Sequence, residues 1–392
     1  MRSEKFTFQG HDGSTLAGSL DLPTGPRRGA ALFAHCFTCS KDFIASKRIA
    51  QALAAAGYAV LRFDFTGLGH SEGEFANTNF TSNTADLVAA AEALGERIAP
   101  PALLVGHSLG GAAVLAAAAQ IDSVKAVATI AAPADPDHVK HNFGGSLQEI
   151  EAEGEAEVKL AGRTFTIRKQ LLDDLRSSTV LDKTGDLHRP LLILHAPRDE
   201  TVGIDNATKL FLAAKHPKAF VGLDDTDHLL TAKGAAENVA AVIAAWASRW
   251  IAPSENPEEI ESGVRVTELD PTGFLHRIDA PRGRSAIADE PERMGGTDAG
   301  LTPFELVGAG LAACTSMTMR MYANRKEWPL TASEVDVTCS QEDRTTTTFR
   351  RVVRIDGDLS DNQRARLIEI ANRCPVHRML EGDVTVETET GN

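Results

Sequence analysis

The sequence predicts an α/β fold with a mostly parallel sheet over residues 1–252, followed by a smaller α+β domain over residues 263–392. Two observations predict the first part. Short apolar runs alternate with amphipathic helical patterns, which is typical of a parallel sheet with helices on both faces, and one apolar run leads directly into a Gly-x-Ser-x-Gly turn. A third observation divides the chain, because the acidic, proline-containing stretch 253–262 is typical of a linker.

The elements of the first part follow a regular order. The segment 1–22 alternates apolar and polar residues, so it predicts a β-hairpin and not a signal peptide. Residues 133–189 break the alternation and are expected to form a lid over the site, with a hairpin over 158–169 and a helix over 170–177. The other expected strands are 29–34, 58–63, 102–105, 124–131, 190–195 and 219–223, and the expected helices are 42–56, 81–94 and 235–250.

In the second part, strands precede and follow two helices, which is typical of an α+β fold. The helix expected over 302–323 is apolar on nearly all faces, so we expect it to be buried. A second helix is expected over 360–372. The expected strands are 263–268, 274–280, 334–340, 346–358 and 384–389.

Composition limits the partners and the compartment. The chain has 392 residues, 43% of them hydrophobic, and a net charge of −14. This acidic balance argues against nucleic acid or an anionic membrane surface as a partner, and no apolar run approaches the ~18 residues of a membrane helix. The 5 cysteines, without a secretion signal, predict free thiols in a reducing compartment, the cytoplasm.

The turn Gly106-His107-Ser108-Leu109-Gly110 lies between a predicted strand and a predicted helix, which is the signature of a nucleophile elbow. Its two glycines remove side chains that would collide in so sharp a turn. We therefore expect Ser108 as a nucleophile at the carboxyl edge of the sheet. The same pentapeptide recurs around Ser71, but it precedes no apolar helix, so we interpret that copy as a loop.

A serine hydroxyl needs a base to take its proton and a carboxylate to orient that base. His228 follows the last predicted strand, and Asp199 lies in the loop after the preceding one. The order Ser108, Asp199, His228 is the order that this fold expects. Neighbouring candidates are interpreted as turn or core residues: Asp224, Asp225, Asp227 and His195.

These motifs resemble those of the α/β-hydrolases over roughly residues 1–250. The resemblance also rests on the segment 34–38 after an early strand and on the loop 64–71. It implies that the backbone N–H groups of Phe37 and Leu109 form an oxyanion hole, which is typically worth a few kcal/mol per donor.

Cys36 takes the place of the glycine usual in that family, so the sequence leaves acyl specificity open. With Cys39 it forms a C-x-x-C pair, which elsewhere marks a redox pair or half of a zinc site. No second pair follows at ligand spacing, so we expect no metal, and a redox role stays as an alternative to two free thiols.

Two further cysteines have a helical context. Cys314 lies in the helix expected over 302–323, and Cys374 precedes Pro375, so it would cap a helix where the dipole and Arg373 lower the pKa of a thiol. A buried thiol facing a thiol of low pKa suits the reduction of peroxides. Cys339 alternates with valines on a strand and is interpreted as a core residue.

The segments around Cys314 and Cys374 resemble the OsmC/Ohr thiol peroxidases, over roughly residues 262–390. The resemblance implies that Cys314 is the peroxidatic and Cys374 the resolving thiol, that organic hydroperoxides and a thiol reductant are the substrates, and that the protein is an intertwined homodimer. Active members also use a glutamate, for which Glu305 is the candidate, and an arginine in an early turn, which the turn 270–273 lacks. The sequence therefore leaves two alternatives for Cys314 and Cys374, which are reactive thiols or inert buried cysteines.

The favoured function is a serine hydrolase that cleaves small carboxylic esters through an acyl-enzyme, without a cofactor, and that is fused to an OsmC-like domain. The alternative is a thiol peroxidase in which the hydrolase-like part is a binding or interaction module.

Overall fold

The computed structural model describes residues 2–25, 27–37, 39–160, 163–252, 260–269, 272–341 and 346–390. The chain divides into two compact units, Met1–Glu259 and Ile260–Asn392. Most of the predicted linker 253–262 and half of the predicted turn 270–273 lie outside the described residues. None of the helices in the described ranges has the length and apolar character needed to span a bilayer.

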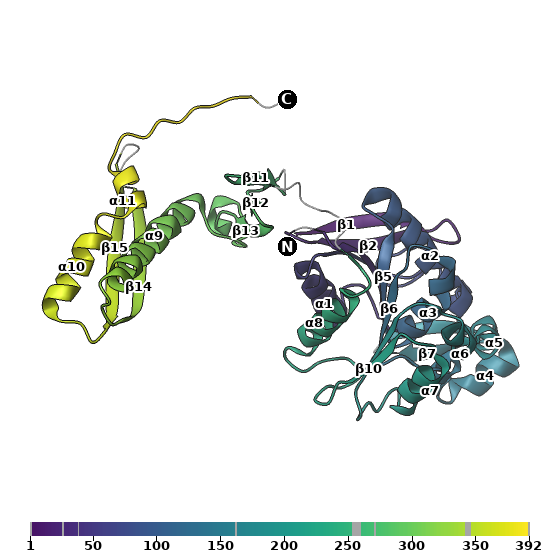
Figure 1. Ribbon diagram of the computed structural model, residues 1–392. Helices are drawn as coiled ribbons and strands as arrows, with labels where there is room; N and C mark the ends of the chain where they lie inside the picture. Colours follow the sequence, from purple (N-terminus) through teal and green to yellow (C-terminus); the bar gives the residue numbers. More distant parts are fainter. Residues whose placement is uncertain are drawn as a thin grey trace. The chain divides into compact units, whose positions relative to one another are not determined.

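An eight-stranded sheet forms the centre of the first unit, in the strand order β1-β2-β4-β3-β5-β6-β9-β10 (Figure 1). The pairings β1–β2 and β2–β4 are antiparallel, and every pairing from β4 to β10 is parallel, which confirms the predicted mostly parallel sheet. The strands are β1 (Arg2–Gln9), β2 (Thr15–Leu22), β3 (Gly29–Ala34), β4 (Tyr58–Phe63), β5 (Pro101–His107), β6 (Ala126–Ile130), β9 (Leu191–His195) and β10 (Lys218–Gly222).

Helices cover both faces of this sheet. Figure 1 shows α1 (Ile44–Ala55) and α8 (Ala235–Ala247) on one side, and α2 (Phe80–Arg97) and α3 (Leu109–Ala117) on the other. Successive side chains of a strand point to opposite faces. Leu104 and Val105 of β5 accordingly belong to two separate core clusters, with α2, α3 and α7 (Asp205–Ala213) on one side and α1 and α8 on the other. This two-sided burial explains the continuous apolar sequences of the central strands.

The segment between β6 and β9 contains a β-hairpin and several helices that pack onto one face of the sheet. Its strands β7 (Glu155–Leu160) and β8 (Arg163–Arg168) make an antiparallel hairpin that begins three residues earlier than predicted. In β7 the apolar residues alternate with outward-facing charged residues and join the core cluster that contains α2 and α3. The helical elements of this segment are a 3₁₀ helix (Pro136–Phe143), α4 (Ser146–Glu153), α5 (Lys169–Ser177) and α6 (Val180–Gly185).

In its described residues, the second unit combines a three-stranded and a two-stranded antiparallel sheet with three α-helices and a short 3₁₀ helix (Glu292–Met294). The predicted strand over 384–389 is wrong, since these residues pair with no strand in the described part of the chain, and Val386 is 83% exposed. β13 was not predicted. The elements are β11 (Arg265–Glu268), β12 (His276–Ala280), β13 (Arg284–Ala288), α9 (Pro303–Arg325), β14 (Leu330–Gln341), β15 (Thr347–Gly357), α10 (Asp361–Ala371) and α11 (Pro375–Leu380).

Two expectations about burial in this unit are also wrong. The helix α9 buries one stripe of residues and leaves others in contact with solvent, such as Met317 at 65% and Met321 at 72% exposure. Within one chain, β14 and the C-terminal helices cover only that stripe. Cys339 is exposed and not a core residue, because it lies toward the end of a two-stranded sheet. The buried stripe of α9 is Gly308, Leu311, Thr315, Met319 and Ala323.

Candidate active site

The turn between β5 and α3 places Ser108 in a strained backbone conformation, with φ of 55°. A Cβ atom on Gly106 would lie 2.3 Å from the carbonyl oxygen of Gly110. A Cβ atom on Gly110 would lie 2.4 Å from the carbonyl oxygens of Ala34 and His35. No side chain fits at either glycine. Gly106 allows the end of β5 to lie against the first turn of α3, and Gly110 allows the chain after β3 to lie directly against the same turn.

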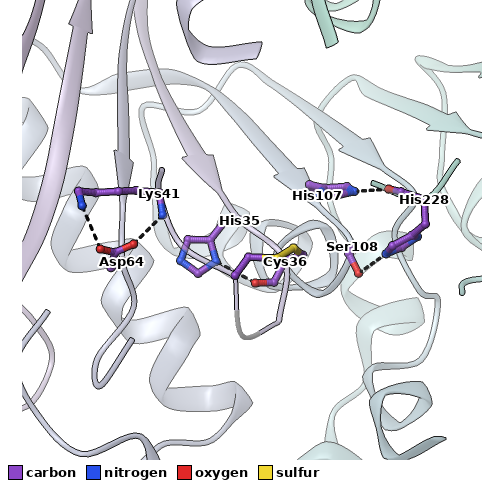
Figure 2. The surroundings of a disulfide bond; sticks show 8 residues. His35, Cys36, Lys41, Asp64, His107, Ser108 and His228 are labelled. Atoms are coloured by element: carbon purple, nitrogen blue, oxygen red, sulfur yellow. Dashed lines mark hydrogen bonds and ion pairs between the residues drawn. A yellow bond between two sulfur atoms is a disulfide. The ribbon is translucent and has the colours of Figure 1, made fainter. Parts of the chain in front are cut away.

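Ser108, His228 and Asp199, the residues predicted as nucleophile, base and orienting carboxylate, lie in one hydrogen-bonded row. Ser108 Oγ lies 3.0 Å from His228 Nε2, and His228 Nδ1 lies 2.8 Å from Asp199 Oδ2. Figure 2 shows the imidazole of His228 directed at the Ser108 hydroxyl. Because a carboxylate can only accept, Nδ1 carries the proton, and Nε2 is free to accept one from the serine.

Asp199 is held as a carboxylate. Burial raises the pKa of Asp199. Hydrogen bonds from His228 and from the backbone N–H groups of Val202 and Thr201 lower this pKa, and their combined effect is larger than that of burial. These amides donate to Asp199 Oδ1 over 2.8 and 2.9 Å. The pKa therefore lies below its ordinary value, and the group that orients His228 stays charged at neutral pH.

Two buried histidines support the loops that carry these residues. His107 Nε2 donates to the carbonyl oxygen of His228 over 2.7 Å, and His195 Nε2 donates to that of Val202 over 2.7 Å. Burial lowers the pKa of both, that of His107 to about 4, so both are neutral donors at pH 7. His195 was predicted as a core histidine. Nothing in the sequence indicated a role for His107, whose acceptor lies far along the chain.

The loop after β3, residues 35–41, is fixed at both ends by buried groups (Figure 2). At one end, His35 Nδ1 donates to the carbonyl oxygen of Cys36 over 2.8 Å. At the other end, Asp64 accepts from the backbone N–H of Lys41 over 2.6 Å and from its ammonium group over 3.1 Å. Thr38 lies outside the described residues.

Cys36 and Cys39 are joined by a disulfide bond, with their Cα atoms 5.3 Å apart. The expectation of free thiols is therefore wrong for this pair and holds for the other cysteines, which are Cys314, Cys339 and Cys374. A local turn explains the difference, because the N–H of Cys39 donates to the carbonyl oxygen of Cys36 over 3.1 Å and brings the two side chains together.

A cavity of about 750 Å³ opens above Ser108 and His228. Phe37 and Leu109, whose N–H groups were predicted to form an oxyanion hole, line it, and so do Cys36 and Cys39. Among the described residues, no group of three or more His, Cys, Asp or Glu side chains is arranged to hold a metal ion. The hairpin β7–β8 supplies part of the wall through Lys159, Leu160 and Arg163.

The second unit brings Cys374 close to Thr315, a neighbour of Cys314. Cys374 is fully buried, and its sulfur accepts from the N–H of His377 over 3.3 Å as it caps α11. Burial raises the pKa of Cys374, but the His377 amide and the Thr315 hydroxyl outweigh it. Cys314 and the charge of Arg351 act in the same direction, so the pKa lies below its ordinary value. Cys314 is half-buried on α9.

Arg351 was not predicted as part of this site. Its guanidinium group donates to Thr315 Oγ1 over 2.8 Å and to the carbonyl oxygen of Ala371 over 3.1 Å. Glu305 instead caps α9, where its carboxylate accepts from the N–H of Thr302 over 2.8 Å. Nine residues of helix, about 13 Å, separate it from Cys314, so one chain does not bring Glu305 to the thiols.

A solved structure described as the esterase domain of a Rhodothermus marinus protein is 50% identical to this chain, with a TM-score of 0.53. The match covers 64% of this chain and 99% of the other. The chain belongs to the α/β-hydrolases. A family model described as serine aminopeptidase S33 matches residues 25–159 of this α/β-hydrolase, and one described as OsmC-like protein matches residues 296–389. An α/β-hydrolase domain is thus fused to an OsmC-like domain.

Two more distant proteins share the hydrolase fold or part of its sequence. Est1E from Butyrivibrio proteoclasticus, solved with ferulic acid bound, is 20% identical to this chain, with a TM-score of 0.54. The match covers 62% of this chain and 98% of Est1E, and it shows the fold alone. The mitochondrial palmitoyl-protein thioesterase ABHD10 of Mus musculus is 29% identical over 152 residues, which are 37% of this chain and 50% of that protein.

The neutral state of His107 predicts a pH dependence of stability. The pKa of about 4 in the folded state lies below the ordinary value of 6.5, so between these values the unfolded chain binds more protons and stability falls as the pH falls. His107→Gln keeps a donor that does not titrate. We expect wild type to lose on the order of 2 kcal/mol more than His107→Gln between pH 7 and pH 5.

Urea unfolding at both pH values measures this difference. Both proteins carry Trp328→Phe, so that the fluorescence reports on Trp246 and Trp250 of the first unit. An equal loss of unfolding free energy in the two proteins would show that His107 is protonated at pH 5 in the folded state as it is in the unfolded chain.

Proposed function

We propose that the α/β-hydrolase domain is a serine esterase in which Ser108 is the nucleophile, His228 the general base and Asp199 the group that orients the base. The observation that carries this proposal is the row of hydrogen bonds from Ser108 Oγ to His228 Nε2, 3.0 Å, and from His228 Nδ1 to Asp199, 2.8 Å. Ser108 and His228 line a cavity large enough for a small ester.

Ser108 Oγ attacks the ester carbonyl carbon while its proton passes to His228 Nε2. The negative charge that develops on the carbonyl oxygen accepts hydrogen bonds from the N–H groups of Phe37 and Leu109. Collapse of this intermediate expels the alcohol, which takes the proton from His228 and leaves an acyl group on Ser108. Water then repeats the sequence and releases the acid. Throughout, Asp199 stabilises the imidazolium form of His228.

The substrate class is a small carboxylic ester or thioester. The cavity wall combines apolar side chains, such as those of Leu160 and Val139, with polar ones. One similar structure is described as an esterase domain and one curated relative as a palmitoyl-protein thioesterase, so both printed activities are acyl transfers to water. The hairpin β7–β8 supplies part of the wall, and we infer that this insertion selects the acyl group.

We predict that Ser108→Ala abolishes both hydrolysis of p-nitrophenyl esters and covalent labelling by a fluorophosphonate. Asp199→Asn leaves the shape of the site intact but removes the acceptor that fixes the imidazole tautomer, so kcat falls by roughly 10⁴-fold. The kcat values and the mass of the labelled peptide measure these effects.

Ser71→Ala is the matched control, because it alters the second Gly-x-Ser-x-Gly copy, whose hydroxyl donates to the carbonyl oxygen of Asp64. We expect it to be labelled on Ser108 as the wild type is. Ester turnover by Ser108→Ala would contradict the proposal. Absence of turnover and of labelling in the wild type would favour the alternative, in which this domain only binds.

We further propose that the OsmC-like domain reduces organic hydroperoxides. The supporting observation is that the pKa of Cys374, which lies beside Cys314 and within reach of the charge of Arg351, lies below its ordinary value. The Cys314 sulfur, the more accessible of the two, attacks the O–O bond and becomes a sulfenic acid as the alcohol leaves. The Cys374 thiolate then attacks this sulfur, water leaves, and a thiol reductant restores the disulfide to two thiols. This proposal includes a homodimer that covers the exposed apolar residues of α9.

We predict that Cys314→Ser sharply lowers the rate at which cumene hydroperoxide is consumed in the presence of dithiothreitol, and that Cys374→Ser lets a sulfenic acid accumulate on Cys314. Dimedone trapping and peptide mass measure the second effect. Cys339→Ser is the control. Because Cys339 is exposed on β14, we expect this substitution to leave the rate of hydroperoxide consumption unchanged. Unchanged hydroperoxide consumption by Cys314→Ser would contradict this role.

A further inference from the structure

The Cys36–Cys39 disulfide lies within the loop proposed to stabilise the oxyanion, residues 35–41. Figure 2 shows it between the buried His35 and the Ser108–His228 pair. The two ends of the loop are held by groups that are almost inaccessible to solvent, His35 at 2% and Lys41 at 8% exposure, and the latter is bound to the fully buried Asp64. The ends are therefore fixed whether or not the disulfide is present.

The middle of the loop has weaker support. In its described residues, one backbone hydrogen bond crosses it, from the N–H of Cys39 to the carbonyl oxygen of Cys36, 3.1 Å. The Phe37 ring has aromatic neighbours in Phe75 and Phe143, with centroids 5.8 and 6.2 Å away. Phe37 lies inside the ring that the disulfide closes. The disulfide is thus the covalent constraint on the N–H group assigned to the oxyanion.

The sulfur pair is reached through the substrate cavity. Both cysteines line the cavity that contains Ser108. Cys36 is only 4% exposed, whereas Cys39 is half-buried and is the more accessible partner. A small thiol that enters the cavity can approach this bond, as a substrate approaches Ser108.

We propose that the Cys36–Cys39 disulfide is an exchangeable redox site that positions the Phe37 N–H, so that its reduction switches the esterase to a low-activity form. This proposal rests on the proposed esterase function.

The exchange is balanced in both directions. A small dithiol attacks one sulfur of the disulfide and releases the other as a protein thiol. The second thiol of the dithiol then attacks the sulfur of the dithiol that is bound to the protein and releases the remaining cysteine, so the products are two protein thiols and a cyclic disulfide. In the reverse direction, one protein thiolate attacks an organic hydroperoxide and becomes a sulfenic acid as the alcohol leaves. The second thiol condenses with it, water leaves, and the disulfide is restored.

Reduction changes the transition state more than the binding of the ester. Deleting one oxyanion donor typically lowers kcat by roughly 10²- to 10³-fold, and a donor that is loosened but still present costs less. We expect kcat to fall about tenfold on reduction, with KM changed by less than about twofold, because the donor acts on charge that develops only in the transition state.

The test uses the full chain. Protein treated with dithiothreitol is freed of reductant without oxygen, and kcat and KM for p-nitrophenyl acetate are measured before and after reoxidation by cumene hydroperoxide. An aliquot is alkylated and digested with trypsin, since the peptide 29–41 contains Cys36 and Cys39 and no other cysteine. We expect two alkyl groups on this peptide, a fall in kcat and its recovery on reoxidation.

Two variants test whether the change in kcat comes from the Cys36–Cys39 pair. Cys36→Ser/Cys39→Ser is expected to have the low kcat with or without reductant, and Cys339→Ser is expected to respond as the wild type does. A fully reduced peptide with kcat within twofold of the oxidised value would overturn the proposal. So would a disulfide that resists dithiothreitol in the folded protein.

Hydrogen exchange separates this proposal from the proposed function. If the oxidised protein neither cleaves esters nor is labelled on Ser108, the esterase proposal fails, but deuterium uptake by the peptide 29–41 still measures the loop. Reduction is expected to raise uptake in this peptide and to leave β6 unchanged. Equal uptake in both redox states would show that the disulfide does not hold the loop.

Discussion

The close approach of the chain after β3 to the first turn of α3 is the constraint on which the site depends. At Gly110, a Cβ atom would lie 2.4 Å from the carbonyl oxygens of Ala34 and His35, so no other residue allows the two segments to meet. This contact sets loop 35–41 beside the turn that carries Ser108. The two backbone N–H groups proposed for the oxyanion, those of Phe37 and Leu109, come from the two sides of this contact.

Around this contact, buried polar groups hold the loops without adding charge to the site. His107 and His195 are neutral, since burial lowers the pKa of each, and both donate to main-chain oxygens of the loops that carry His228 and Asp199. A neutral donor fixes a loop and leaves the negative charge of Asp199 as the group that acts on the base. In the proposed mechanism, the proton that moves is shared between Ser108 and His228.

Local patterns predicted the parts of the molecule that local geometry determines. The elbow could be predicted because a strand, two glycines and a helix fix its shape within a few residues. The absent strand over 384–389, the exposed Cys339 and the exposed side of α9 could not, because pairing and burial depend on distant segments. His107 and Arg351 were missed for the same reason. The C-x-x-C spacing was noticed, but the inference of free thiols came from the compartment, whereas the bond depends on the turn at Cys36.

The most direct test of this account is a crystal structure of the protein after reaction with a p-nitrophenyl phosphonate, which mimics the tetrahedral intermediate on the nucleophile. We expect phosphorus bonded to Ser108 Oγ and the phosphonyl oxygen within about 2.7–3.1 Å of the backbone nitrogens of both Phe37 and Leu109, with the Cys36–Cys39 disulfide intact. A phosphonyl oxygen directed away from these nitrogens, or phosphorus on another residue, would contradict it.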